Sequence, residues 1–280
     1  MTNKFNKSRD AKILICVIVA FAIYYVMAKL FFHTLELYII TTIPNRIAAF
    51  VVAYLLVGLP LFVATWLINQ RKNIFQDVGL MANPWIGLSF SIICTFPMFA
   101  GYAYMAGGLA GGLSVTILVT NNLLAGVFEE TYFRGFLFGQ LFRNTRLGFL
   151  PAIILCSVLF SSGHLYQSTD TKVLLGILST TFLGSVLFAW LYVEWGYNIW
   201  VPMFLHSLMD ISWYLFGTGF NALGGIGANV FRLTTVLLAI SLTIIYKRRT
   251  KQLFLVNKQT RWWKGAPDRS AVALGSDALF

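Results

Sequence analysis

Charge is scarce in this 280-residue chain. Only 11% of the residues are charged, whereas 58% are hydrophobic and 16% are aromatic. A water-soluble domain of this size does not need so much apolar side-chain surface, so the composition excludes a soluble globular protein. Several apolar runs exceed 18 residues, enough for a helix to cross the hydrocarbon core of a bilayer. The chain is therefore predicted to be a polytopic membrane protein.

Cysteine and acidic residues are scarce too. The three cysteines, Cys16, Cys94 and Cys156, all fall inside apolar runs, which excludes a disulfide framework and a CxxC zinc site. Ten Asp and Glu stand against 21 Lys and Arg, which gives a net charge of +11. The basic residues lie at the ends of apolar runs rather than in one motif. They indicate membrane topology and contact with the lipid bilayer, and not nucleic-acid binding.

The predicted fold class is an all-α polytopic transmembrane helical bundle, because backbone groups in lipid must form hydrogen bonds within their own segment. We expect eight spans, at residues 13–32, 47–68, 85–105, 113–142, 147–163, 173–193, 198–217 and 230–246. The fourth span would be about 45 Å long as a helix, which exceeds a hydrocarbon core of about 30 Å. It is expected to tilt, to break near residues 120–122 or to leave the membrane at one end.

Lys and Arg are distributed unevenly between the two sides of these spans. With the N-terminus inside, 16 of the 21 fall in cytoplasmic segments and four in outer segments. The positive-inside rule then places both termini in the cytoplasm. We expect a cytoplasmic N-terminal tail at 1–12, the bundle at 13–246 and a basic cytoplasmic C-terminal tail at 247–280. The last dozen residues of that tail are expected to be disordered.

Three charged residues interrupt the apolar stretch 121–140, namely Glu129, Glu130 and Arg134. A charge at the bilayer centre costs about 2.5–3.5 kcal/mol on insertion scales, so such residues face inward and mark candidate functional sites. Glu130 and Arg134 are spaced i, i+4 on a helix, which predicts a structural ion pair. Glu129 is rotated about 100° from Glu130, which leaves it as the working acid.

Two of the three histidines lie in or beside predicted spans. His164 closes the fifth span, four residues after Phe160. His206 and Asp210 lie in the seventh span at i, i+4, on one helix face. Pro202 lies four residues before His206 and removes a backbone amide, which predicts a distorted helix beside a water-filled cavity.

These residues form three motifs in chain order: EExxxR at Glu129, Glu130 and Arg134, FxxxH at Phe160 and His164, and HxxxD at His206 and Asp210. In order and spacing they resemble the CPBP family of intramembrane endopeptidases. That family includes CAAX-processing proteases of prenylated proteins and bacterial bacteriocin-processing or immunity proteins. The resemblance covers about residues 121–216. Many members have Asn at the position of Asp210, and an ionised Asp cannot donate a hydrogen bond to an oxyanion.

The resemblance implies a hydrolase that cleaves a peptide, or a lipidated or membrane protein, as an integral protein of a bacterial cell membrane. By analogy with the family, Glu129 is the general base. His164 would help Glu129, and the two side chains would hold the attacking water together.

The other motif residues receive supporting roles from the same resemblance. His206 would donate to the carbonyl oxygen as the tetrahedral intermediate forms. Asp210 would orient His206, or would itself donate if it is protonated. Glu130 and Arg134 would fix the fourth helix, and Phe160 would pack the floor of the site beside His164.

Other readings of the same residues stay open. We expect no metal cofactor, but Glu129, His164 and His206 are also sensible zinc ligands that would leave a position for water. HExxH, which would indicate such a site, is absent. A proton-coupled transporter could place the same polar cluster at mid-membrane. A non-catalytic membrane scaffold or immunity protein could keep the fold without turnover.

Overall fold

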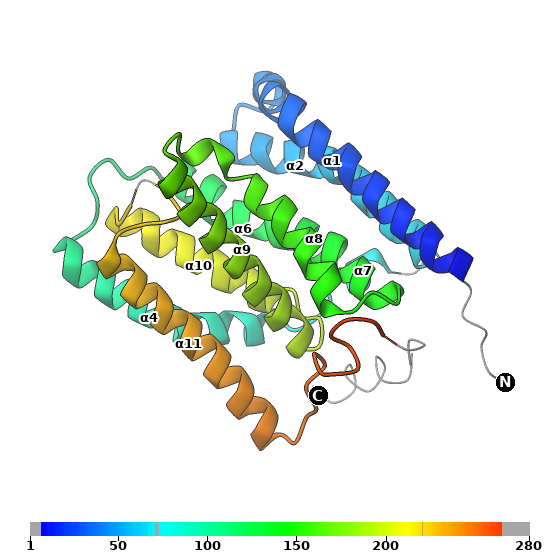
Figure 1. The fold of residues 1–280 in the computed structure, drawn as a ribbon. Helices are drawn as coiled ribbons and strands as arrows, with labels where there is room; N and C mark the ends of the chain where they lie inside the picture. The colour runs from blue at the N-terminus through cyan, green and yellow to red at the C-terminus, as the bar shows by residue number, and fades with distance from the viewer. Residues whose placement is uncertain (1–6, 71–72, 220, 265–280) are drawn as a thin grey trace.

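A computed structural model of the chain describes residues 7–70, 73–219 and 221–264. These residues form helices and no β-strand (Figure 1), which confirms the all-α bundle. The longer helices are α1 (Lys7–Thr42), α2 (Arg46–Ile68), α4 (Pro84–Ala106), α8 (Phe149–Ser162), α9 (Thr171–Glu194), α10 (Trp200–Phe216) and α11 (Ile226–Arg249). The shorter ones are α3 (Ile74–Asp77), α5 (Val115–Ile117), η1 (Leu118–Leu124), α6 (Ala125–Glu129), η2 (Glu130–Phe138), α7 (Gly139–Asn144) and η3 (Leu165–Gln167).

Six segments of the described chain are long and apolar enough to cross a membrane, and the prediction of eight was wrong. They are Ser8–Thr42, Arg46–Ile68, Pro84–Ala106, Phe149–Gln167, Thr171–Glu194 and Ile226–Arg249. The two predicted spans that fail are 113–142 and 198–217. The first is divided into short helices, and the second is reduced to the 17 residues of α10. The first carries Glu129, Glu130 and Arg134 and the second carries His206 and Asp210, whereas Phe160 and His164 lie in the candidate span Phe149–Gln167.

The predicted fourth span contains two π-helical segments. The segments η1 and η2 are π-helical and lie on either side of the five-residue α-helix α6. The η1 segment includes residues 120–122, where a break was expected. A π-helix hydrogen-bonds i to i+5, as the bond from the amide of Gly139 to the carbonyl of Arg134 illustrates. Such windings are often found at functional sites, and here the second one begins at Glu130, directly after Glu129.

Polar side chains at the helix starts explain several boundaries. Asn45, Asn83 and Asp170 each accept a hydrogen bond from a backbone amide in the first turn of the helix that follows. Gly107 and Gly217 end α4 and α10 in the left-handed conformation, which glycine adopts without a steric penalty. The glycine-rich segments therefore act as helix ends.

Helix α10 lies at the centre of the bundle, against α4, η1, α6 and α9 (Figure 1). One glycine sets its distance from α6. A Cβ atom at Gly126 would lie 2.5 Å from the hydroxyl of Ser207, closer than real Cβ atoms approach. That hydroxyl donates to the carbonyl of Leu123 at 3.0 Å. Helix α6, which ends at Glu129, and helix α10, which holds His206, therefore approach each other closely.

The described part of the C-terminal segment folds back on the bundle. Lys247 belongs to α11 and forms a buried ion pair with Glu194, which also accepts the amide of Val256 at 2.8 Å. The carbonyls of Thr260 and Trp262 accept amides at the start of α8. Residues 250–264 are thus structured, and the predicted disorder of the last dozen residues lies outside the described residues. At the other end, residues 7–12 of the predicted N-terminal tail belong to α1.

Candidate active site

The site is built on a completely buried ion pair. Nη1 of Arg134 lies 2.9 Å from Oε1 of Glu130, and both side chains are 0% exposed. The guanidinium lies over the ring of Phe160 at 4.2 Å and near that of Phe188 at 5.4 Å. Since an Arg cation is attracted to aromatic faces, the two rings replace water around the charge. The ion pair predicted from the i, i+4 spacing is present.

The same carboxylate also holds a histidine. Nδ1 of His206 donates to Oε1 of Glu130 at 2.7 Å, across 76 positions of sequence. Oε2 of Glu130 is buried and has no hydrogen-bond partner among the described residues. Glu130 therefore does more than fix its own helix, which was its predicted role. It joins η2 to α10 and fixes which nitrogen of His206 faces the protein.

The other nitrogen of His206 faces Asp210. Nε2 lies 3.3 Å from Oδ2 of Asp210, one turn later on α10. The His206 side chain is 12% exposed and that of Asp210 is 42% exposed, so the accessible side of this pair is the Nε2 side. The imidazole stacks on the ring of Phe188, with a centroid distance of 5.1 Å and an interplanar angle of 25°. His206 is thus held by the carboxylate of Glu130, the ring of Phe188 and the partly exposed carboxylate of Asp210.

Glu129 lies at the junction between α6 and the π-helix η2. Its side chain is half-buried, and within the described part of the chain it makes no hydrogen bond or ion pair. The charges of His206 and Asp210 both act on its carboxylate. A carboxylate that is not engaged by protein donors retains its lone pairs for water or substrate.

His164 lies just beyond the end of α8. Its Nδ1 lies 3.2 Å from the carbonyl oxygen of Phe160, and since a carbonyl only accepts, Nδ1 carries the proton. In the neutral imidazole, Nε2 is then an acceptor. The charges of His206 and Asp210 act on His164 as well, so it belongs to the same electrostatic environment.

Phe160 connects these groups. Its ring centroid lies 5.2 Å from that of His164 and 6.3 Å from that of His206, while Arg134 covers one face. Arg134, His164 and His206 therefore surround one aromatic ring. Phe188 plays a similar part between Arg134 and His206, and sequence reasoning missed it. It lies in the uniformly apolar run of α9, where nothing distinguishes it from its neighbours.

The structure brings most of the predicted residues together, but not in every predicted pair. Glu130, Arg134, His206 and Asp210 are in direct contact, and Phe160 joins His164 to them. No hydrogen bond or ion pair between Glu129 and His164 is found in residues 7–70, 73–219 and 221–264. The water that these two residues would share stays a prediction.

The zinc alternative requires three ligands at one point. No three His, Cys, Asp or Glu side chains of the described residues gather closely enough to hold a metal ion. His164 and His206 each use Nδ1 for another protein atom, so only their Nε2 atoms remain for a ligand. Arg134, Glu130, His206 and Asp210 form a chain of polar contacts, and the expectation of no metal cofactor stays a prediction.

Comparisons with known proteins identify the region that carries the site. The family model described as "Type II CAAX prenyl endopeptidase Rce1-like" matches residues 111–212. The matched segment contains all seven residues of the three motifs, from Glu129 to Asp210. No curated protein and no solved structure matches the chain.

Proposed function

Since residues 111–212 belong to the Rce1-like CAAX prenyl endopeptidase family and this membrane protein is a peptidase, we propose that the cluster around Glu130 and His206 is its catalytic centre. The reaction is hydrolysis of a peptide bond by water that Glu129 and His164 activate. The observation that carries the proposal is the fixed orientation of His206, held at Nδ1 by Glu130 and turned at Nε2 toward the accessible side.

The attacking water is assigned to Glu129 and His164. Both have an acceptor without a protein donor: the carboxylate of Glu129 and Nε2 of His164. A water bound to these acceptors directs a lone pair at the scissile carbonyl carbon. Glu129 takes the proton as the carbon–oxygen bond forms and passes it to the leaving amine as the carbon–nitrogen bond breaks. General base catalysis of this kind contributes about 10²–10⁴-fold in rate.

The oxyanion of the tetrahedral intermediate is assigned to Nε2 of His206. A preorganised donor aimed at the developing charge acts strongly where water is excluded. With Nδ1 held by Glu130, the ring keeps its orientation throughout the reaction. With both ring nitrogens protonated, Nε2 donates to Asp210 before substrate binds, and the oxyanion replaces the carboxylate as acceptor of this proton in the intermediate. Asp210 thus orients the exposed edge of the ring, and an ionised carboxylate cannot itself donate to an oxyanion.

This assignment uses no resident metal ion. The support is the chemistry of the side chains present. Two imidazoles are fixed through Nδ1, and the acid that would complete a ligand set with them, Glu129, forms no hydrogen bond or ion pair with either in the described part of the chain. Elemental analysis and chelation test this part of the proposal separately from the rest.

The substrate is proposed to be a polypeptide held at the membrane, either a lipidated protein or a membrane-embedded segment. The support is the position of the site among six helices able to span a bilayer. The test is a comparison of new protein termini in cells that contain the wild-type protein or the Glu129→Ala variant. Termini that vanish in the variant identify substrates. Equal sets of termini at equal protein levels would overturn the proposal and favour a non-catalytic scaffold.

A further inference from the structure

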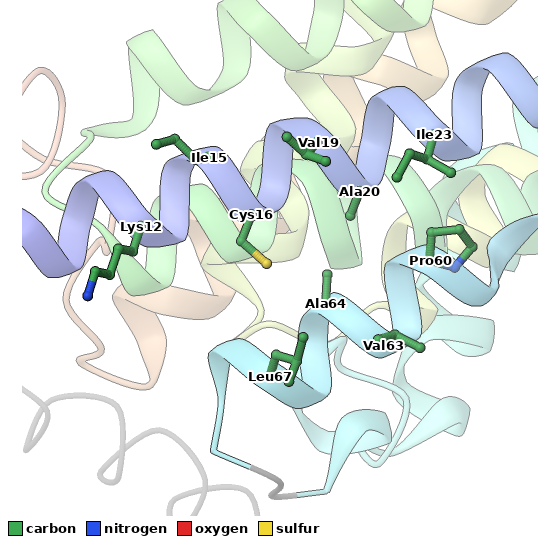
Figure 2. A pocket seen from close by; sticks show the side chains of 10 residues that line it. All are labelled: Lys12, Ile15, Cys16, Val19, Ala20, Ile23, Pro60, Val63, Ala64 and Leu67. Carbon is green, nitrogen blue, oxygen red and sulfur yellow. The ribbon is translucent and has the colours of Figure 1, made fainter.

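A groove lies between the first two helices, away from the catalytic cluster. It has a volume of about 460 Å³, within the range of about 300–1,000 Å³ of small-molecule sites. Figure 2 shows its walls, with Val19 and Ile23 on α1 and Val63 and Leu67 on α2. Three of these residues are about half exposed: 50% for Val19, 52% for Val63 and 56% for Leu67. Both helices are candidate membrane spans, so the groove opens toward the hydrocarbon of the bilayer.

Small side chains line the deeper part of this groove. Cys16 and Ala20 of α1 lie opposite Ala64 of α2 (Figure 2). Ala20 and Ala64 are buried, so the two helices are in contact there. The space above them is a shallow apolar channel along the helices. A linear hydrocarbon chain fits such a channel, because it fills apolar space without leaving a polar group unsatisfied.

One end of the groove carries a cation. Among the described residues, Lys12 is the only charged one that lines it, and it is exposed. Lys12 forms no ion pair within residues 7–70, 73–219 and 221–264. The nearest acid in the sequence, Asp10, is bound to Arg146 at 2.9 Å and does not neutralise it. Arg9 precedes Lys12 by three positions on the same helix and is likewise exposed, which adds a second cation at this end.

We propose that this groove binds one anionic phospholipid. One acyl chain lies between α1 and α2, and the phosphate of the headgroup lies against Lys12 and Arg9. A long Lys side chain extends its stem along apolar surface and places its ammonium at the membrane surface, where anionic headgroups lie. Charge complementarity makes the headgroup anionic, and the apolar walls make the ligand a lipid rather than a free phosphate.

The bound lipid stabilises the helix that supports the catalytic region. The Phe21 ring of α1 contacts the Phe133 ring edge-on at 5.1 Å, and Tyr24 contacts Tyr132 at 5.0 Å. Tyr25 is hydrogen-bonded to Ser162, near the end of α8, at 3.1 Å. Occupancy of the groove adds contacts that keep α1 and α2 together, so thermal stability is expected to rise with the amount of anionic lipid.

The experiment is retention of lipid on the intact protein. The wild type is reconstituted in phosphatidylcholine vesicles that contain phosphatidylglycerol as a minor component, extracted gently and examined by native mass spectrometry. One retained phosphatidylglycerol per protein is expected, enriched at least about tenfold over its share of the vesicle, which corresponds to about 1.4 kcal/mol. Lys12→Glu should lose this enrichment, and Val19→Trp should lose the lipid altogether because the indole fills the groove.

Matched variants separate the site from general effects. Lys172→Glu reverses an exposed charge elsewhere, and Ile18→Trp places an indole at the adjacent α1 position, which is 45% exposed and does not line the groove. Both should retain the lipid. Val63→Trp repeats the filling test from α2 if Val19→Trp does not fold. Equal retention of phosphatidylcholine and phosphatidylglycerol, unchanged retention in Lys12→Glu, or displacement of the lipid by inorganic phosphate would overturn the proposal. None of these measurements depends on peptidase activity.

Discussion

His206 is hydrogen-bonded to Glu130, the second of the two adjacent glutamates, and not to Glu129. Nδ1 of His206 and Oε1 of Glu130 are 2.7 Å apart, and the same oxygen lies 2.9 Å from Arg134. The two acids therefore have different tasks. Oε1 of Glu130 is engaged by both Arg134 and His206, whereas Glu129 has no such partner among the described residues. This difference can be tested by changing each acid alone.

Glu129→Gln should abolish turnover and leave the protein stable. The amide cannot take a proton from water, so the rate should fall by about 10²–10⁴-fold. No hydrogen bond of the described structure is lost, so the thermal midpoint should stay close to that of the wild type. Cleavage of a substrate found by terminus analysis, together with thermal unfolding, measures both. A Glu129→Gln protein that keeps wild-type turnover would remove Glu129 from the mechanism.

Arg134→Met should destabilise the protein. It leaves the completely buried carboxylate of Glu130 without its cation, and breaking one side of a buried pair costs about 3–5 kcal/mol. Thermal unfolding in detergent and protein level in the membrane are the measurements.

The double variant Glu130→Leu with Arg134→Met is the control for this prediction. It removes both charges, so it should be more stable than Arg134→Met alone, since apolar replacement of a whole buried pair is often neutral. It should still be inactive, because His206 loses its anchor at Nδ1. An Arg134→Met protein of wild-type stability and no activity would instead make Arg134 a catalytic residue.

Asp210→Asn separates the metal-free mechanism from the zinc alternative. Asn can accept from Nε2 of His206 through its carbonyl, so the variant should keep most of its activity, whereas Asp210→Ala should lose it. The purified protein should also keep its activity in strong chelators and contain no stoichiometric zinc. Chelator-sensitive cleavage that added zinc restores, together with an inactive Asn variant, would reverse this assignment.

Gly126→Ala should move α6 away from α10. The new methyl group would lie 2.5 Å from the Ser207 hydroxyl, and overpacking of this kind typically costs about 1–3 kcal/mol. Because Glu129 and His206 lie on these two helices, activity should fall together with the thermal midpoint. Adding Ser207→Ala removes the clashing oxygen and should restore part of both.

Gly184→Ala is the matched control for the same substitution. A Cβ atom at Gly184 meets no atom within 4 Å, and Ala is favoured over Gly inside a helix by roughly 0.5–1 kcal/mol. Stability should therefore stay the same or rise slightly. If Gly126→Ala behaves like Gly184→Ala, the close approach of α6 to α10 does not matter for the site.

Local spacing was enough to predict the contacts within one helix. The pairs Glu130–Arg134 and His206–Asp210 are spaced i, i+4, and helix geometry alone brings such residues together. The all-α bundle also followed from composition. The family resemblance rested on the same motifs, and the match to residues 111–212 confirms it.

Contacts between helices could not be predicted in the same way. The bond from His206 to Glu130 spans 76 positions, and no periodicity encodes it. Phe188 is one apolar residue among many in α9, so its place beside Arg134 and His206 had no sequence signal. The number of spans was wrong because the segment 113–142 is divided by changes of helical winding and α10 has only 17 residues, and neither feature could be predicted from the apolar runs.

The bonds between the C-terminal segment and α8 have a consequence for the order of events during synthesis. The amides of Gly148, Phe149 and Leu150 are bonded to carbonyls of residues 260–262, and the first turn of a helix has no intrahelical partners for such amides. A ribosome makes residue 149 more than 100 positions before it makes Thr260, and the N-terminal parts of a chain fold first. Helix α8, which ends just before His164, therefore waits, incompletely bonded at its start, until residues 260–262 have been made. A nascent chain stalled before residue 260 should hold a membrane-inserted but immature peptidase.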